Sequence, residues 1–190
     1  MSYFGGFIQQ IRVQTATTKI ALVLLAVVSA QAAAATRHTQ SGVVVRVVDG
    51  DTLWLKTSTA APPLKLRIQG IDAPEICQLG GLLARDALKV KVWGQRVTVT
   101  LSAHDQYGRA VGTVHMQDQD IGRWMVVQGH AWVYSYRSKK APYSAEFSQA
   151  QEQKRGIFST AAIEEPRIFR KRHGSCQART RTSQILWAGF

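Results

Sequence analysis

Hydrophobic and polar residues alternate in five segments of the chain, which is typical of β-strands with one buried face. The third segment is the clearest, because Leu64, Leu66 and Ile68 alternate with Lys65 and Arg67. This alternation places Arg67 on the face opposite the apolar side chains. The Asp49-Gly50 dipeptide between the first two segments is a strong turn signal. The five expected strands are residues 43–48, 52–56, 64–70, 97–101 and 110–116.

Helical spacing of apolar residues predicts three helices, over residues 82–93, 121–128 and 143–154. Gly129 and Gly156 follow the second and third of them and act as C-terminal stop signals. Three strands, a helix, two strands and further helices is the order of an OB-fold, a small barrel that often binds nucleic acids. We therefore expect an α+β chain, an OB-fold five-stranded β-barrel with about three helices. Because one fold serves many functions, the function has to be argued from individual residues.

The N-terminal segment has the pattern of an export signal. Arg12 and Lys19 are basic, residues 20–30 are apolar, and residues 32–35 are alanines suited to cleavage. The apolar run is shorter than the roughly 20 residues that a membrane span needs. We expect a signal peptide over residues 1–35 and a mature chain in the bacterial periplasm or outside the cell; an uncleaved anchor is the alternative. Residues 36–41 are expected to be flexible, 42–160 to form the domain, and 161–190 to form a basic C-terminal extension.

Positive charge dominates the composition. The chain has 24 Lys and Arg against 12 Asp and Glu, a net charge of +12. Residues 1–35 hold two positive and no negative charges, so the mature chain keeps +10. Such a surplus favours polyanionic partners, since each neutralised phosphate releases counterions. Solubility or attraction to anionic membranes is the alternative explanation of this charge.

Acidic residues are few, yet four of them follow the first three expected strands. Asp51 and Asp72 offer hard oxygen ligands of the kind that calcium or magnesium binds. Glu75 follows Asp72 by three residues across a proline, so a tight turn would direct both carboxylates into one site. The alternative is that Asp-Gly is only a turn and that Asp-Ala-Pro-Glu is only the entry to a helix.

Two arginines suit phosphate chemistry. Arg67 lies on the third expected strand, and Arg109 follows a Tyr-Gly turn. A guanidinium group matches phosphate oxygens with two parallel hydrogen bonds, and fixed positive charge stabilises the negative charge that gathers in phosphoryl transfer. Among 24 basic residues, however, spacing alone does not single out these two.

Three motifs together resemble the staphylococcal nuclease family. They are Val-Asp-Gly-Asp-Thr-Leu at 48–53, Leu-Arg-Ile-Gln-Gly-Ile-Asp-Ala-Pro-Glu at 66–75 and Asp-Gln-Tyr-Gly-Arg at 105–109. Their order and approximate spacing agree with that family, and residues 127–133 and 155–158 add further likeness. The resemblance covers roughly residues 42–160. The first motif alone is weak, whereas the three together are highly specific.

The resemblance implies roles for individual residues. Asp51, Asp72 and the backbone carbonyl of Ala73 would bind calcium. Glu75 would act as general base or orient the attacking water, and the two arginines would bind the phosphate and stabilise the five-coordinate transition state. The residues implied to contact the nucleotide are Tyr107, Tyr134 and Tyr136. For the last two, ordinary core packing is the alternative.

The resemblance thus predicts a calcium-dependent endonuclease that cuts DNA and RNA by attack of water at phosphorus. We expect a monomer without a stable protein partner. One alternative is an OB-type module that binds nucleic acid without cutting it. Another is a membrane-anchored protein with a degenerate nuclease domain.

The chain has two cysteines, Cys77 and Cys176. In an exported protein an even count favours a disulfide bond, and two unrelated free thiols are the alternative. A bond between them would hold the C-terminal extension beside Glu75. It would also bring a set of basic residues towards the substrate: Arg167, Arg170, Lys171 and Arg172.

Overall fold

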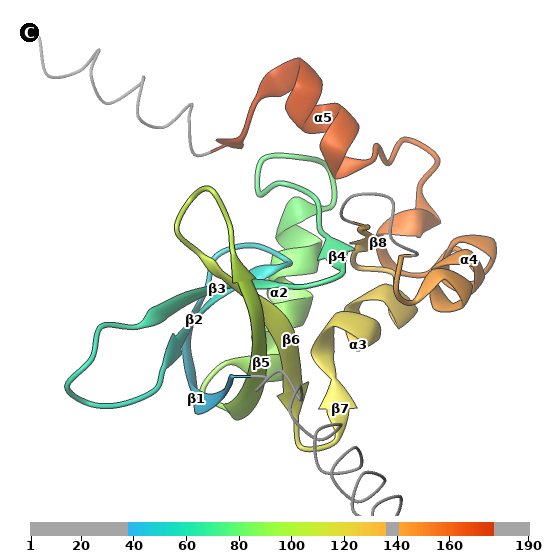
Figure 1. Cartoon of the computed structure of the whole chain (residues 1–190). Coiled ribbons are helices and arrows are strands. Elements are labelled where there is room, and N and C mark those ends of the chain that lie inside the picture. Colours follow the sequence, from blue (N-terminus) through green and yellow to red (C-terminus); the bar gives the residue numbers. More distant parts are fainter. Residues whose placement is uncertain (1–37, 136–140, 177–190) are drawn as a thin grey trace, which may run out of the picture. The chain divides into compact units, whose positions relative to one another are not determined.

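A closed barrel forms the centre of the fold (Figure 1). The computed structural model describes residues 38–135 and 141–176. Neighbouring strands follow the order β3-β2-β1-β5-β6, and a parallel pairing of β3 with β6 closes the barrel. The predicted five-stranded OB-type barrel is therefore confirmed. Its strands are β1 (Thr39–Val47), β2 (Thr52–Lys56), β3 (Leu64–Ile68), β5 (Arg96–His104) and β6 (Ala110–Met116).

The alternation in the sequence separates the inside of the barrel from its outside. Leu53 and Leu55 of β2 and Leu66 of β3 are fully buried. Each buried side chain of this size contributes about 1.5–3 kcal/mol to folding. Trp54, Lys65 and Arg67 alternate with them and therefore lie on the outer face.

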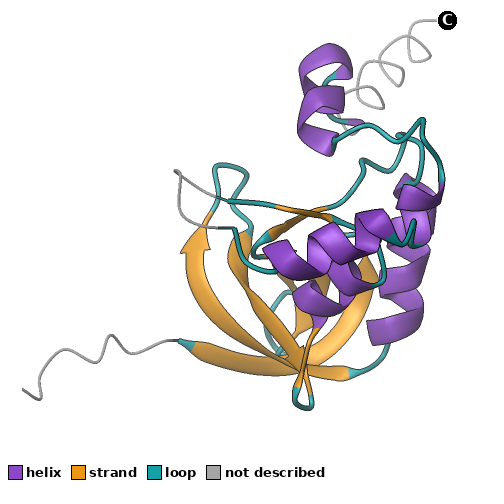
Figure 2. Cartoon of the chain, turned by 90° about the vertical axis from the view of Figure 1, so that its right-hand side faces the viewer, coloured by secondary structure: helices purple, strands orange, loops and turns teal. Residues whose placement is uncertain are grey.

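The helices gather on one side of the barrel (Figure 2). The helix α2 (Gly81–Val92) buries Ala84, Leu88 and Val92, which are spaced four residues apart along one face. The remaining helices are α3 (Ile121–Val127), α4 (Ser144–Glu152), the 3-10 helix η2 (Gly156–Ser159) and α5 (Pro166–His173). Three short strands complete the fold: β4 (Ile71–Asp72) pairs with β8 (Trp132–Val133), and β7 (Gln119–Asp120) pairs with β6.

The structure departs from the predicted boundaries at three places. Residues 39–41, predicted to be flexible, belong to β1 and pair with Thr98–Thr100 of β5. The third strand ends at Ile68 and not at Gly70, whose positive φ of 83° breaks the strand. The fourth helix, α5, lies in the extension and was not predicted, although Pro166 at its start, basic residues in its last turn and Gly174 after its end are helix boundary signals. The predicted signal peptide lies outside the described residues.

A disulfide bond joins Cys77 to Cys176, which confirms the predicted pair. The side chain of Gln78 adds a second link, because its Nε2 donates to the Glu164 carbonyl at 2.6 Å. Helix α5 consequently lies over the loop between β4 and α2 (Figure 1). In the chain-entropy view, closing a loop of this length stabilises the fold by up to about 4–5 kcal/mol.

The first residue of α2 should tolerate no side chain. A Cβ on Gly81 would overlap the carbonyl oxygen of Glu75, so Gly81→Ala has to separate the helix from the loop. We expect a loss of about 1–3 kcal/mol in the free energy of unfolding, measured in urea. Val90→Ala on the same helix is the control, because Val90 is 89% exposed and surface substitutions usually change stability by no more than about 0.5 kcal/mol. Equal stability of the Gly81→Ala and wild-type proteins would contradict this packing.

Candidate active site

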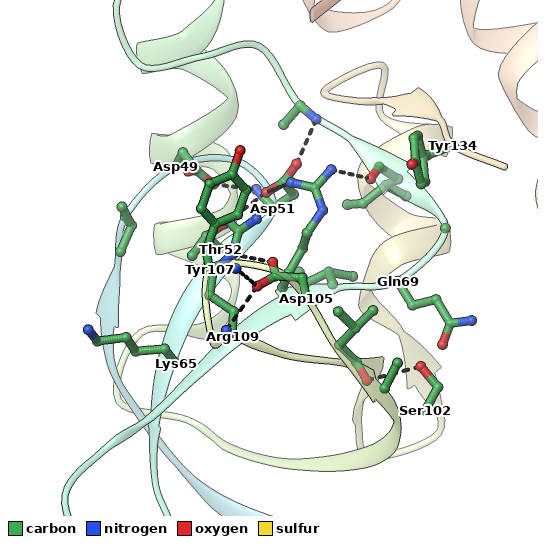
Figure 3. A pocket seen from close by; sticks show the side chains of 18 of the residues that line it. Asp49, Asp51, Thr52, Lys65, Gln69, Ser102, Asp105, Tyr107, Arg109 and Tyr134 are labelled. Carbon is green, nitrogen blue, oxygen red and sulfur yellow. Dashed lines mark hydrogen bonds and ion pairs between the residues drawn. The ribbon is translucent and has the colours of Figure 1, made fainter. Parts of the chain in front are cut away.

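A cleft of about 1090 Å³ runs along the outer wall of the barrel. It begins where the β1–β2 turn, the end of β3 and the β5–β6 turn meet, and Figure 3 shows side chains from these segments converging. Segments far apart in the sequence are thus brought to one place. The predicted site residues that line the cleft are Asp51, Arg67, Ala73, Glu75, Tyr107, Arg109 and Tyr134.

Arg67 connects two buried carboxylates. Its Nη1 donates to Asp51 Oδ1 and its Nη2 to Asp72 Oδ1, each at 2.9 Å. The two aspartates are each only 3% exposed. Burial alone would lower the pKa of Arg67, but the charges of Asp51 and Asp72 outweigh it and raise the pKa above its ordinary value. Arg67 is therefore a fixed positive charge at the floor of the site.

The β1–β2 turn holds Asp51 in place. Thr52 Oγ1 donates to Asp51 Oδ1 at 2.9 Å, and the Ala73 amide donates to Oδ2 at 3.1 Å. The Asp51 amide in turn donates to Asp49 Oδ1 at 3.0 Å. Burial and the neighbouring Asp51 charge raise the pKa of Asp49 to about 8. Asp49, which the sequence treated only as part of a turn, thus helps to fix the backbone of Asp51.

Asp105 positions Arg109. Its Oδ1 accepts the backbone amides of Tyr107 and Arg109, and its Oδ2 accepts Arg109 Nε at 2.7 Å. Burial would raise the pKa of Asp105, but the hydrogen bonds from Arg109 outweigh it and lower the pKa. Arg109 Nη1 then donates to Thr52 Oγ1 at 3.0 Å, so Thr52 links this arginine to Asp51. The sequence motifs contain Thr52 and Asp105, but the motifs alone do not predict that Thr52 connects Arg109 to Asp51, because these residues meet only in the folded chain.

Arg170 reaches the same carboxylates from α5. Its Nη2 donates to Asp72 Oδ2 at 2.8 Å, while its Nη1 donates to Asp72 Oδ1 and Glu75 Oε1 at 3.1 Å each. Burial would lower the pKa of Arg170, but the bonds from Asp72 and Glu75 outweigh it and raise the pKa. Of the basic residues expected near the substrate, Arg172 instead pairs with Glu164. The sequence indicated that Arg170 could approach the site only through its closeness to Cys176, whose predicted bond to Cys77 brings the extension beside Glu75.

Two of the three predicted tyrosines lie beside the arginines. Tyr107 is 73% exposed, and the Arg109 Cζ lies 5.4 Å from its ring centroid. Tyr134 is also exposed, with the Arg67 Cζ 6.0 Å from its ring centroid. Exposed aromatic rings beside cationic groups suit contacts with nucleotide bases. Tyr136 falls outside the described residues.

The site contains carboxylate oxygens, which are the type of ligand that calcium takes, and guanidinium groups contact them in this structure. Arg67 joins Asp51 to Asp72, and Arg170 joins Asp72 to Glu75, so two guanidinium groups connect three carboxylates. Within residues 38–135 and 141–176, no cluster of three His, Cys, Asp or Glu side chains is arranged to hold a metal unaided. A calcium ion bound here would therefore need backbone and water oxygens to complete its shell, which calcium accepts readily.

Comparison with known proteins adds independent information. A family model described as staphylococcal nuclease homologue matches residues 65–160. An uncharacterized endonuclease of Escherichia coli O157:H7 is 39% identical over 132 residues, which cover 69% of this chain and 85% of that protein. The micrococcal nuclease of Shigella flexneri is 34% identical over 143 residues, covering 68% and 80% of the two chains. The matched family region contains Arg67, Asp72, Glu75 and Arg109 and ends before α5.

Removal of the Arg170 guanidinium should destabilise the fold. Arg170→Gln leaves the nearly buried Asp72 with less compensating charge and frees Glu75. We expect a loss of about 1–3 kcal/mol in the free energy of unfolding, measured at neutral pH in a chelator. The control is Arg172→Gln on the same helix, whose side chain is 66% exposed and whose ion pair should contribute about 0–1 kcal/mol. Equal losses in the two variants would show that Arg170 does not hold these carboxylates.

Proposed function

Because the chain belongs to the staphylococcal nuclease family and is a nuclease, we propose that it is a calcium-dependent endonuclease that hydrolyses DNA and RNA by attack of water at phosphorus. The observation that carries this proposal is the convergence of Arg67, Arg109, Asp51 and Glu75 in one cleft, with Asp72 held against Arg67 beside it. The net charge of +12 supports a polyanionic substrate.

Arg67 and Arg109 provide the means of binding the phosphodiester. Each is held by a carboxylate partner, Asp51 for one and Asp105 for the other, so its orientation is set before substrate arrives. Preorganised donors of this kind stabilise developing charge without having to reorganise during the reaction. We infer that the phosphate lies between the two guanidinium groups, with a base against Tyr107 or Tyr134.

Glu75 is the candidate general base. Its Oε1 accepts from Arg170, while no hydrogen bond among the described residues occupies Oε2. Its side chain is 20% exposed, so water reaches it. In this proposal Oε2 takes a proton from the attacking water, and the arginines stabilise the charge that gathers on the phosphate oxygens.

Asp51, Asp72 and the backbone carbonyl of Ala73 are the proposed calcium ligands. Both carboxylates are fixed by hydrogen bonds, and the Ala73 amide donates to Asp51, so residue 73 lies next to the carboxylates. Bound there, calcium would add positive charge beside the phosphate.

Activity should depend on calcium and on the carboxylate of Glu75. Calcium should support cleavage of plasmid DNA and of RNA, and a chelator should abolish it. Glu75→Gln keeps the shape of the side chain but removes the proton acceptor, so kcat should fall by about 10²–10⁴-fold. Glu152→Gln on the exposed end of α4 is the control and should retain wild-type kcat.

Two outcomes would contradict the proposal. Undiminished cleavage in excess chelator would exclude the calcium mechanism. Wild-type kcat in Glu75→Gln would show that the base lies elsewhere. A protein that binds DNA and RNA but cuts neither under any of these conditions would instead be the binding module that the sequence left as an alternative.

We also propose that the protein is exported. The Cys77–Cys176 bond suits an oxidising compartment and supports this proposal. As a separate finding, the described residues contain no helix that is both long and apolar enough to cross a membrane. The support for cleavage is the basic, apolar and alanine-rich sequence of residues 1–35. N-terminal sequencing of protein from the periplasm or medium should give a start between Ala33 and Arg37. A start at Met1 or Ser2 would contradict cleavage.

A further inference from the structure

A row of three side chains crosses the outer wall of the barrel next to the candidate active site. Arg46 of β1 pairs in register with Trp54 of β2, which pairs with Lys65 of β3. The Arg46 Cζ lies 4.7 Å from the Trp54 ring centroid, and the Lys65 Nζ lies 5.5 Å from a ring of the same indole. All three line the cleft that contains Arg67 and Arg109. The indole thus lies between two cations on a surface that substrate can reach.

The charges in this row differ from those at the active site. Arg67, Arg109 and Arg170 each form ion pairs with aspartate or glutamate. Arg46 and Lys65 form none among the described residues, and both side chains are exposed. Their positive charge is therefore available to an anion, while that of the active-site arginines is already balanced.

Strand geometry relates the row to the scissile phosphate. Thr52 pairs with Arg67, and Trp54 pairs with Lys65 two residues further along both strands. Residues two apart on a strand face the same way and lie about 6.6–6.8 Å from each other. Because Arg67 is a proposed phosphate ligand, Trp54 and Lys65 lie one such step away on the same wall. Figure 3 shows Lys65 at the edge of the pocket, apart from the cluster around Asp51.

We propose that Arg46, Trp54 and Lys65 form a subsite for the nucleotide that adjoins the scissile phosphate in single-stranded DNA or RNA. The base stacks on Trp54, and the two cations bind the flanking phosphates. This proposal rests on the nuclease function proposed above. The subsite requires an unstacked base, which a single strand offers at low cost and a duplex does not.

The binding energies of the two contacts favour replacement of a cation by a nucleotide base on the Trp54 indole. Stacking of a base on an aromatic side chain strengthens binding by about 5- to 150-fold, whereas an exposed cation–π contact is worth about two- to fivefold. A base that displaces Arg46 or Lys65 from the ring therefore gains more than is lost. The displaced cation remains beside the ring, where it meets phosphate.

The binding test uses the purified full chain in a chelator, so that no cleavage occurs. Its probe is a fluorescent single-stranded oligonucleotide of about 12 nucleotides, followed by anisotropy. Trp54→Ala should weaken binding by about 5- to 150-fold, and Trp54→Phe, which keeps an aromatic face, should restore most of it. Arg46→Gln and Lys65→Gln should each reduce the slope of log K against log salt by about 0.7.

Trp93→Ala is the matched control. Trp93 at the end of α2 is 49% exposed and has the Lys89 Nζ 5.1 Å from its ring centroid, yet it does not line the cleft. This variant should bind the oligonucleotide as the wild type does. Wild-type affinity in Trp54→Ala, or equal weakening in Trp93→Ala, would overturn the subsite.

A cleavage test separates this proposal from the proposed function. With calcium present, kcat/KM is measured for the oligonucleotide and for a small nitrophenyl phosphodiester, which does not reach the subsite. Trp54→Ala should lower kcat/KM for the oligonucleotide by about the same factor as its affinity for the oligonucleotide falls in chelator, and should leave kcat/KM for the small substrate unchanged. An unchanged ratio of these two kcat/KM values would overturn the subsite. A wild-type protein that cleaves neither substrate would refute the proposed function, while the binding result in chelator would still support or overturn the subsite.

Discussion

The ion pairs of Arg67 with Asp51 and Asp72 are the interaction on which the site depends. Two nearly buried carboxylates would repel each other and lose their hydration without a positive charge between them. The guanidinium supplies that charge and fixes the spacing of the two oxygens that it contacts. It also joins the end of β3 to the β1–β2 turn, so the pairing of β2 with β3 and the geometry of the nuclease site depend on each other. Conservative changes at Arg67 therefore act on packing as well as on chemistry.

The sequence predicted the parts of the structure that follow from local periodicity. Alternation located all five barrel strands and put Arg67 on the outer face, and the three motifs named most of the residues that meet in the cleft. Two features depended on contacts between distant residues and were not predicted. The start of β1 at Thr39 is set by pairing with β5, because residues 39–41 carry no apolar pattern of their own. The contact of Arg170 with Glu75 spans 95 residues, so no local pattern in the sequence could predict it, even though Pro166 and Gly174 mark the bounds of the helix.

Paired and unpaired positive charges lie in different parts of the cleft, which separates attraction of the substrate from its precise positioning. At the candidate active site, Arg67, Arg109 and Arg170 each pair with a carboxylate, so their orientation is fixed while the local net charge stays small. Further along the wall formed by β1, β2 and β3, Arg46 and Lys65 form no ion pair among the described residues and remain exposed. Unpaired charge on a surface raises the local concentration of a polyanion and speeds its association, whereas paired charge in a cleft favours defined geometry. A strongly basic protein can in this way attract nucleic acid without loosening its reactive centre.

The position of Cys176 also sets an order of events during biosynthesis. Every strand of the barrel precedes this residue in the chain, and protein synthesis delivers the N-terminal part first. The bond to Cys77 can form only after residue 176 has been synthesised and exposed to an oxidant. All residues of the barrel have been synthesised by then and are able to fold. The carboxylates of the β1–β2 turn and the β4–α2 loop can thus assemble before α5 is secured over them. Oxidation can therefore complete this part of the fold last, and a molecule whose Cys176 is still reduced has the carboxylates of the candidate site without their covalently held cover.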